Sequence, residues 1–222
     1  MKKPMIKYEY KEMLANSAKR FRYDECGPAM DSGDMSIRDV ENGLIYIYPR
    51  PHEGFEITSW ADLKPEDIVV VDDDGNLMED NGYLATVELP MHLAIYKARP
   101  DCHVILHTHP LWSSVFAATG KDVPCCLAEQ ALYLGGGTKC TPYALVGSKQ
   151  LGDYIVEALG QDKRTALMRN HGSVVIGNSF AEVFELSRYL EHAAQVAVMG
   201  QLFGGVETFS ARPEDFLDPS LI

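Results

Sequence analysis

Two hydrophobic periods alternate along this chain, and a fold built from helices alone or strands alone cannot accommodate both. Apolar residues recur at helical spacing in five segments, at residues 9–22, 88–98, 111–118, 148–159 and 179–203. Short apolar, β-rich runs stand between them, at residues 35–38, 44–48, 68–71, 76–78, 102–106, around 125, 165–168 and 173–176. We therefore expect one mixed α/β domain in which helices cover a mostly antiparallel sheet.

Turn and capping residues indicate where several of these elements begin and end. Asn42-Gly43 and Asp74-Gly75 each separate two strand-like runs, which is a strong hairpin signal. Ser179 with Glu182 matches a capping box at the start of the last helix, and Thr86 is a candidate cap for the helix over residues 88–98.

The net charge limits the partners that the chain can bind. Its 222 residues include 20 Lys and Arg against 32 Asp and Glu, which gives −12 at pH 7. Such a surface repels phosphate backbones and anionic lipids, so we expect no nucleic acid and no membrane partner. The N-terminus lacks the apolar core of a signal peptide, and no run approaches the ~20 apolar residues of a membrane helix. We expect a soluble, cytoplasmic single domain over residues 1–222, with 206–222 as a peripheral acidic tail.

The cysteines do not form a known framework. They are odd in number, include an adjacent pair and show no Cys-x-x-Cys spacing, which argues against a disulfide scaffold or a cysteine zinc site. We interpret them as buried free thiols. They are Cys26, Cys102, Cys125, Cys126 and Cys140.

Two histidines follow the predicted buried strand over residues 102–106. In an extended segment, residues i and i+2 project to the same side, so His107 and His109 can face one ion. Alone, a His-x-His is more often an ordinary pair at a strand end. His171 in a tight Asn-His-Gly turn and Glu88 at the start of a helix would complete three imidazoles and one carboxylate, a donor set suited to Zn²⁺.

Six short motifs occur in a specific order along the chain. They are Ser32-Gly33-Asp34-Met35-Ser36, Glu88 followed by His92, Ala98-Arg99-Pro100-Asp101, His107-Thr108-His109, Gly135-Gly136 and Asn170-His171-Gly172. By these motifs the chain resembles the class II aldolase/epimerase family, from the first helix to Gly204. No single motif is decisive, but their order and spacing together are specific.

The resemblance implies a metal site and an assembly. Its ligands would be His107, His109 and His171, with Glu88 as a displaceable fourth ligand and Zn²⁺, or else Mn²⁺ or another divalent ion, as the metal. It also implies a three-layer α/β/α fold and a homotetramer with active sites between neighbouring subunits. His92, one helical turn after Glu88, is more simply a packing residue or a partner that orients a ligand.

The resemblance also implies residues for proton transfer and substrate binding. Glu129 is the candidate acid/base residue, because the family carries one in the segment before the double glycine; a solvated strand-end Glu is the structural alternative, and Tyr133 is a weaker candidate. Gly33, Asp34 and Thr86 take the positions of substrate-binding residues.

Two departures from the family pattern bear on the substrate. In phosphate-binding members of the family that the chain resembles, the glycine loop carries Gly-Asn, whereas this chain has Gly33-Asp34. Those members also carry paired serines where this chain has Thr86-Val87. A carboxylate repels a phosphate dianion and Val87 offers no hydrogen bond, which weakens the case for the usual phosphate site. Arg50 and His52 are a candidate replacement clamp, although an exposed loop Arg is the plainer interpretation. A non-phosphorylated hydroxy-ketone or keto acid is slightly favoured.

These features predict a zinc-dependent lyase that cleaves a carbon–carbon bond of a short hydroxy-ketone, sugar or sugar phosphate by retro-aldol chemistry, through a metal-stabilised enediolate. The alternatives on the same scaffold are a dehydratase, a 4-epimerase and a keto-acid decarboxylase. A third alternative is a non-catalytic interaction module like the adducin head. Such a module should lack the metal ligands, whereas all four positions are filled here.

Overall fold

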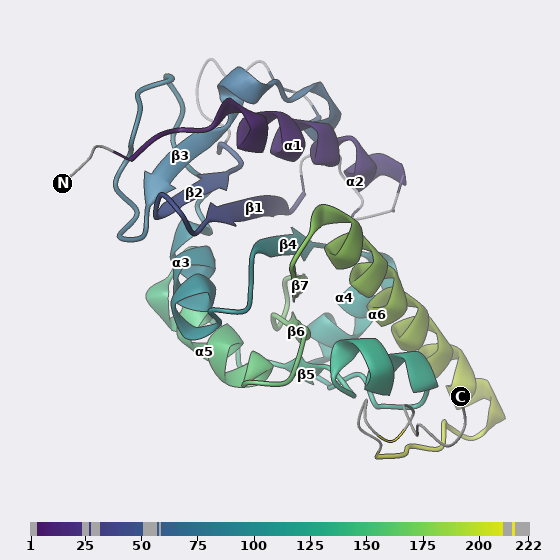
Figure 1. Ribbon diagram of the computed structural model, residues 1–222. Coiled ribbons are helices and arrows are strands. Elements are labelled where there is room, and N and C mark those ends of the chain that lie inside the picture. Colours follow the sequence, from purple (N-terminus) through teal and green to yellow (C-terminus); the bar gives the residue numbers. More distant parts are fainter. Residues whose placement is uncertain are drawn as a thin grey trace.

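Figure 1 shows the computed structural model of the protein, which describes residues 4–23, 27, 32–50, 57, 59–210 and 215. Seven strands form a sheet in the order β3-β2-β1-β4-β7-β6-β5. Neighbouring strands are antiparallel except β5 and β6, which are parallel. The strands are β1 (Asp34–Asp39), β2 (Leu44–Ile47), β3 (Val69–Asp72), β4 (Val104–Thr108), β5 (Lys139–Cys140), β6 (Thr165–Leu167) and β7 (Ser173–Gly177).

Helices cover both faces of this sheet (Figure 1). One face packs against α3 and α5, and the other against α1, α4 and α6. The helices are α1 (Tyr8–Ala18), α2 (Arg20–Tyr23), α3 (Leu89–Ala98), α4 (Leu111–Thr119), α5 (Lys149–Leu159) and α6 (Phe180–Gly200), with short turns at η1 (Trp60–Asp62), η2 (Pro65–Asp67), η3 (Gln130–Leu134, a π-helical turn) and η4 (Gln201–Phe203). The predicted three-layer α/β/α fold is confirmed.

The strands read as apolar runs because both of their faces are buried. In β2, Leu44 and Tyr46 belong to the core under α1 and α6, whereas Ile45 and Ile47 belong to the core under α3 and α5. In β4, Ile105 lies in the core under α3 and α5. Since side chains two residues apart share a face, His107 points toward the α3 side of the sheet.

The predicted turns and elements mostly occur, with two differences. The hairpin over Asn42-Gly43 is confirmed, but beyond Asp74-Gly75 the returning arm is a single bridge between Val71 and Leu77. The expected strand around Cys125 is wrong: that segment contributes only a bridge at Val123, and the η3 turn follows it. The period of a short apolar run does not show whether it forms a strand, because a strand also needs a partner strand to pair with.

The caps also differ in detail from the sequence patterns. The Ser179 hydroxyl accepts the backbone N–H of Glu182, as expected, but the Glu182 carboxylate accepts the N–H of Asn178 at 2.6 Å instead of that of Ser179. Thr86 stands just before α3, where its hydroxyl accepts the N–H of Glu88 at 3.3 Å. Of the helices described, none is long and apolar enough to cross a bilayer. Most of the predicted tail beyond residue 210 lies outside the described residues.

Candidate metal centre

The end of β4 positions His107 and His109. His107 is buried within the strand, and its Nδ1 lies 2.9 Å from the carbonyl oxygen of Ser173 on β7. A carbonyl only accepts, so Nδ1 carries the proton and Nε2 faces the other histidines. Thr108 points to the opposite face of the sheet, so that His109 returns to the side of His107.

The tight turn between β6 and β7 positions His171. Asn170 adopts a left-handed conformation with φ of 59°, which Asn tolerates better than most residues. Gly172 follows, and a Cβ added there would lie 2.5 Å from His109 Cδ2 and 3.2 Å from His107 Cε1. The turn therefore brings its backbone against two imidazole rings, an approach that only glycine allows.

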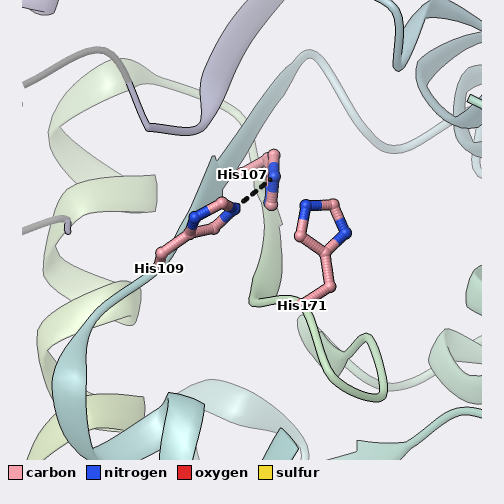
Figure 2. A group of neighbouring side chains, drawn as sticks. All are labelled: His107, His109 and His171. Atoms are coloured by element: carbon pink, nitrogen blue, oxygen red, sulfur yellow. Dashed lines mark hydrogen bonds between the residues drawn. The ribbon is translucent and has the colours of Figure 1, made fainter. Parts of the chain in front are cut away.

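Figure 2 shows the three imidazole rings facing one another. Ring centroids are 4.7 Å apart for His107 and His109, 4.8 Å for His107 and His171, and 4.9 Å for His109 and His171. One nitrogen from each ring lies within 4.8 Å of the other two. In the described part of the chain, no other group of His, Cys, Asp and Glu side chains has this spacing.

Glu88, at the start of α3, adds a carboxylate to the cluster. It is 4% exposed at the start of α3, and its Oε2 lies 2.7 Å from His107 Nε2. Its other oxygen, Oε1, lies 3.7 Å from His171 Nδ1. All four predicted ligands thus converge from three separate segments: α3, the end of β4 and the β6–β7 turn.

The electrostatics of this cluster favour one positively charged imidazole and disfavour a second. Burial lowers the pKa of His107, but the adjacent Glu88 carboxylate outweighs burial and raises it to about 9. Burial lowers the pKa of His109 to about 3, together with the charges of His107 and His171. The pKa of His171 is lowered as well, first by burial and then by His107. Two of the three imidazoles are therefore neutral, which is the protonation state that binds a metal.

Two buried atoms show that the cluster fits a cation. Glu88 Oε1 and His171 Nδ1 have no hydrogen-bond partner among the residues that the structure describes. An unpaired buried polar atom costs about 1–3 kcal/mol, and a divalent ion between the rings would contact both. Imidazole nitrogens with one carboxylate oxygen suit Zn²⁺ and related divalent ions.

The predicted substrate-binding residues lie beside the cluster but contact one another. Asp34 is 2% exposed, and its carboxylate oxygens lie 2.5 Å from the Thr86 hydroxyl and 2.8 Å from His92 Nε2. Burial raises the pKa of Asp34, but His92 outweighs burial and lowers it to about 2. Gly33 has φ of 83°, and a Cβ there would overlap the carbonyl oxygen of His107. A direct substrate contact from these residues stays a prediction.

The predicted acid/base residue lies elsewhere on the chain. Glu129 is exposed just before η3 and lines a cavity of about 630 Å³ with Arg20, Arg188 and His192, among others. The cavity is lined mainly by α6 residues, and Glu129 does not belong to the group formed by His107, His109 and His171. Tyr133 stacks on Tyr189 with ring centroids 5.0 Å apart, also on the α6 side. Both roles stay predictions.

Other predicted residues are only partly described. The backbone N–H of Arg50 donates to the carbonyl of Leu84, which places it near the segment before Glu88, whereas His52 lies outside the described residues. Ser36 and Tyr96 hydrogen-bond each other next to His92, and no role was predicted for either, although Ser36 belongs to one of the family motifs. Their signal was the spacing: Ser36 shares a strand face with Asp34, and Tyr96 shares a helix face with His92.

Comparisons with known proteins agree with this geometry. Residues 29–198 match the sequence profile of the family described as Class II Aldolase and Adducin N-terminal domain, and the chain belongs to this family. A 5-deoxy-D-ribulose 1-phosphate aldolase of Bacillus thuringiensis serovar kurstaki is 31% identical over 186 residues, which cover 84% of this chain and 82% of that protein.

Two further relatives extend the comparison. A probable L-ribulose-5-phosphate 4-epimerase of Mycoplasma pneumoniae is 31% identical over 158 residues, covering 65% of each protein. A solved structure of an L-fuculose 1-phosphate aldolase superimposes with a TM-score of 0.86, covers 98% of both chains and is 24% identical. The predicted family is therefore confirmed, with both aldolases and an epimerase among the relatives.

Proposed function

We propose that the protein is a zinc-dependent aldolase-type lyase that cleaves a carbon–carbon bond of a short polyhydroxy carbonyl compound. The single observation that carries this proposal is the convergence of His107, His109, His171 and Glu88 on one point, where Glu88 Oε1 and His171 Nδ1 have no hydrogen-bond partner among the described residues. The B. thuringiensis aldolase relative supports the reaction class.

The proposed ligands are the three histidines, with Glu88 as the fourth. The ion, when bound, supplies a Lewis acid that stabilises the negative charge that develops on the substrate oxygens during cleavage. The His107 Nδ1 proton bonded to Ser173 fixes the ring so that Nε2 faces the other histidines, where it would hold the ion. Mn²⁺ or another divalent ion remains the alternative metal.

Glu88 is the proposed base. Retro-aldol cleavage removes the proton of the hydroxyl β to the carbonyl, breaks the adjacent carbon–carbon bond to release an aldehyde, and later returns a proton to carbon. Glu88 is held by one oxygen near His107, while its other oxygen is unpaired in the described structure. Its carboxylate is thus placed to leave the ligand position and accept the hydroxyl proton.

Glu129 enters the proposal through a second copy of the chain. It is exposed and apart from the histidines of its own chain, so it would act as acid/base residue in the site of a neighbour within the homotetramer that we propose. We also propose a cytoplasmic location, which the free thiols of Cys102, Cys125, Cys126 and Cys140 support.

The proposed substrate is a hydroxy-ketone, sugar or sugar phosphate with adjacent oxygens that can chelate the ion. The relative's substrate is a sugar phosphate by its name, which supports the phosphorylated class. Asp34, anionic and adjacent to the cluster, disfavours a phosphate at that position and supports a free sugar or keto acid. The second candidate function is 4-epimerisation on the same site, which the epimerase relative favours.

A parallel screen tests the proposed function. The zinc-loaded protein is incubated with free ketoses, their phosphates and keto acids, and the release of aldehyde, the release of CO₂, dehydration and epimerisation are assayed together. We expect aldehyde release that the Glu88→Gln and His109→Ala variants lose. His103→Ala is the matched control, because His103 is not in the cluster. Epimer formation without aldehyde would favour the second candidate, and no turnover with any member of the panel would contradict both.

A further inference from the structure

We propose that Asp34 is a positioning residue, which through Thr86 and His92 holds Glu88 against the histidine cluster. The inference rests on the proposed function, because Glu88 matters only if it is a ligand and base. It assigns to Asp34 and Thr86 a role different from the direct substrate contact expected from the family pattern. The structure supports it at three points.

The first point is that the Asp34 carboxylate hydrogen-bonds residues on both sides of Glu88 in the sequence. Asp34 Oδ2 accepts the Thr86 hydroxyl proton at 2.5 Å, two residues before Glu88. Asp34 Oδ1 lies 2.8 Å from Nε2 of His92, four residues after Glu88. The segment that carries Glu88 is therefore attached to β1 at both ends by one buried side chain.

The second point is that both contacts reach the backbone of Glu88. The Thr86 hydroxyl, while donating to Asp34, accepts the Glu88 N–H at 3.3 Å. The His92 N–H lies 3.4 Å from the Glu88 carbonyl oxygen in the first turn of α3. A change at Asp34 therefore alters the two groups that fix the peptide units on either side of the Glu88 Cα.

The third point is that Asp34 lies directly opposite His107 in the sheet. The two residues are directly paired across β1 and β4, and their side chains lie on the face covered by α3. Asp34 thus connects the strand that carries His107 to the helix that carries Glu88, whose side chains meet at 2.7 Å.

The hydrogen bonds between β1 and α3 continue beyond His92. His92 Nδ1 lies 2.7 Å from the Ser36 hydroxyl, and Ser36 lies 2.8 Å from the Tyr96 hydroxyl. Asp34 and Ser36 are two residues apart on β1 and therefore share a face of the strand, whereas His92 and Tyr96 are four residues apart on α3 and share a face of the helix. The two pairs can therefore contact each other along the strand and the helix. Asp34, Ser36 and His92 are buried, and both Asp34 oxygens already have partners, so a substrate would have to break these bonds to reach the carboxylate.

Zinc affinity and a double-mutant cycle test the proposal. Zinc dissociation constants are measured by competition with a chromogenic chelator for the full chain and for Thr86→Val, Glu88→Gln and the double variant. We expect Thr86→Val and Glu88→Gln each to weaken zinc binding about tenfold, and the double variant to bind no more weakly than Glu88→Gln alone. A merely structural effect of Thr86 would persist in the Glu88→Gln background.

Matched variants separate positioning from damage. Thr86→Ser retains the hydroxyl and should restore the affinity, whereas Thr138→Val removes a buried Thr138–Thr165 hydrogen bond near β5 and should leave it unchanged. At the other contact, His92→Gln retains an amide donor near the Nε2 position and should bind zinc more tightly than His92→Asn. This pair gives the same test if Thr86→Val does not fold.

The outcomes distinguish the two proposals. Weaker binding in Glu88→Gln with wild-type affinity in Thr86→Val and His92→Asn would overturn the positioning role alone. So would a further tenfold loss in the double variant. Wild-type affinity in Glu88→Gln, or no zinc binding by the wild-type chain, would instead overturn the ligand set of the proposed function, and the positioning role with it.

Discussion

Replacing Gly172 with Ala changes one methyl group at the point where the β6–β7 turn meets the histidine rings. The added Cβ would lie 2.5 Å from His109 Cδ2, whereas ordinary contact begins at 3.4 Å, so the ring and the turn must separate by about 0.9 Å. The same Cβ would lie 2.4 Å from the carbonyl oxygen of Thr108, so it would also clash with the backbone next to His107 and His109. Metal ligands must keep their distances to within about 0.2 Å, so this displacement exceeds what a zinc site accommodates.

We therefore expect Gly172→Ala to weaken zinc binding by about tenfold or more and to lower the free energy of unfolding by about 1–3 kcal/mol through overpacking. Zinc titration calorimetry and urea denaturation of the metal-free protein measure the two effects. Gly177→Ala is the control: its Cβ would crowd Val183 Cγ1 at 2.9 Å on the α6 side, without touching a histidine. It should cost stability while retaining zinc affinity. A folded Gly172→Ala protein with wild-type zinc affinity would refute the reasoning.

Three further predictions follow from the described contacts. Ser179→Ala removes the α6 cap and should lower the free energy of unfolding by about 0.5–2 kcal/mol without changing turnover, as urea denaturation and an activity assay would show; equal stability would contradict the cap. Metal-free protein should lose stability as the pH falls from 6.5 toward 3, because the unfolded chain protonates His109 while the fold lowers the pKa of His109 to about 3. His109→Gln should reduce this pH dependence in denaturation curves, and an unchanged pH dependence would count against the burial argument. Mixing inactive Glu129→Gln and His109→Ala proteins under subunit exchange should restore part of the activity, since mixed tetramers pair an intact Glu129 with an intact metal site; no recovery despite exchange would remove Glu129 from a shared site.

Local sequence signals were sufficient for most of the fold. The hairpin over Asn42-Gly43 depends on a turn whose chemistry is contained in two residues, and the α6 stripe spans enough turns for its period to be clear. The strand predicted around Cys125 is wrong because the segment pairs only through one bridge, from Val123 to Thr138 fifteen positions further on. The π-helical turn that follows has no distinct period. Such non-local contacts leave no short-range pattern.

The candidate site divides in the same way. His107 and His109 are two residues apart on one strand, so their convergence follows from strand geometry. His171 and Glu88 could be added to the pair only from their residue types and from the family resemblance, because no local spacing relates the three segments. The hydrogen bonds of Asp34 with Thr86 and His92 could not be predicted, because Asp34 is more than fifty positions from both. Thr86 and His92 also each have an ordinary interpretation, as a cap and as a packing residue.

Metal content tests the central claim most directly. Protein purified without exposure to a chelator is analysed for zinc and manganese, alongside His109→Ala and His171→Ala. A site of three imidazoles and one carboxylate predicts about one divalent ion per subunit in the wild-type chain and a loss of that ion in both variants. Less than about a tenth of an equivalent in wild-type protein, with no uptake on adding zinc, would contradict the account.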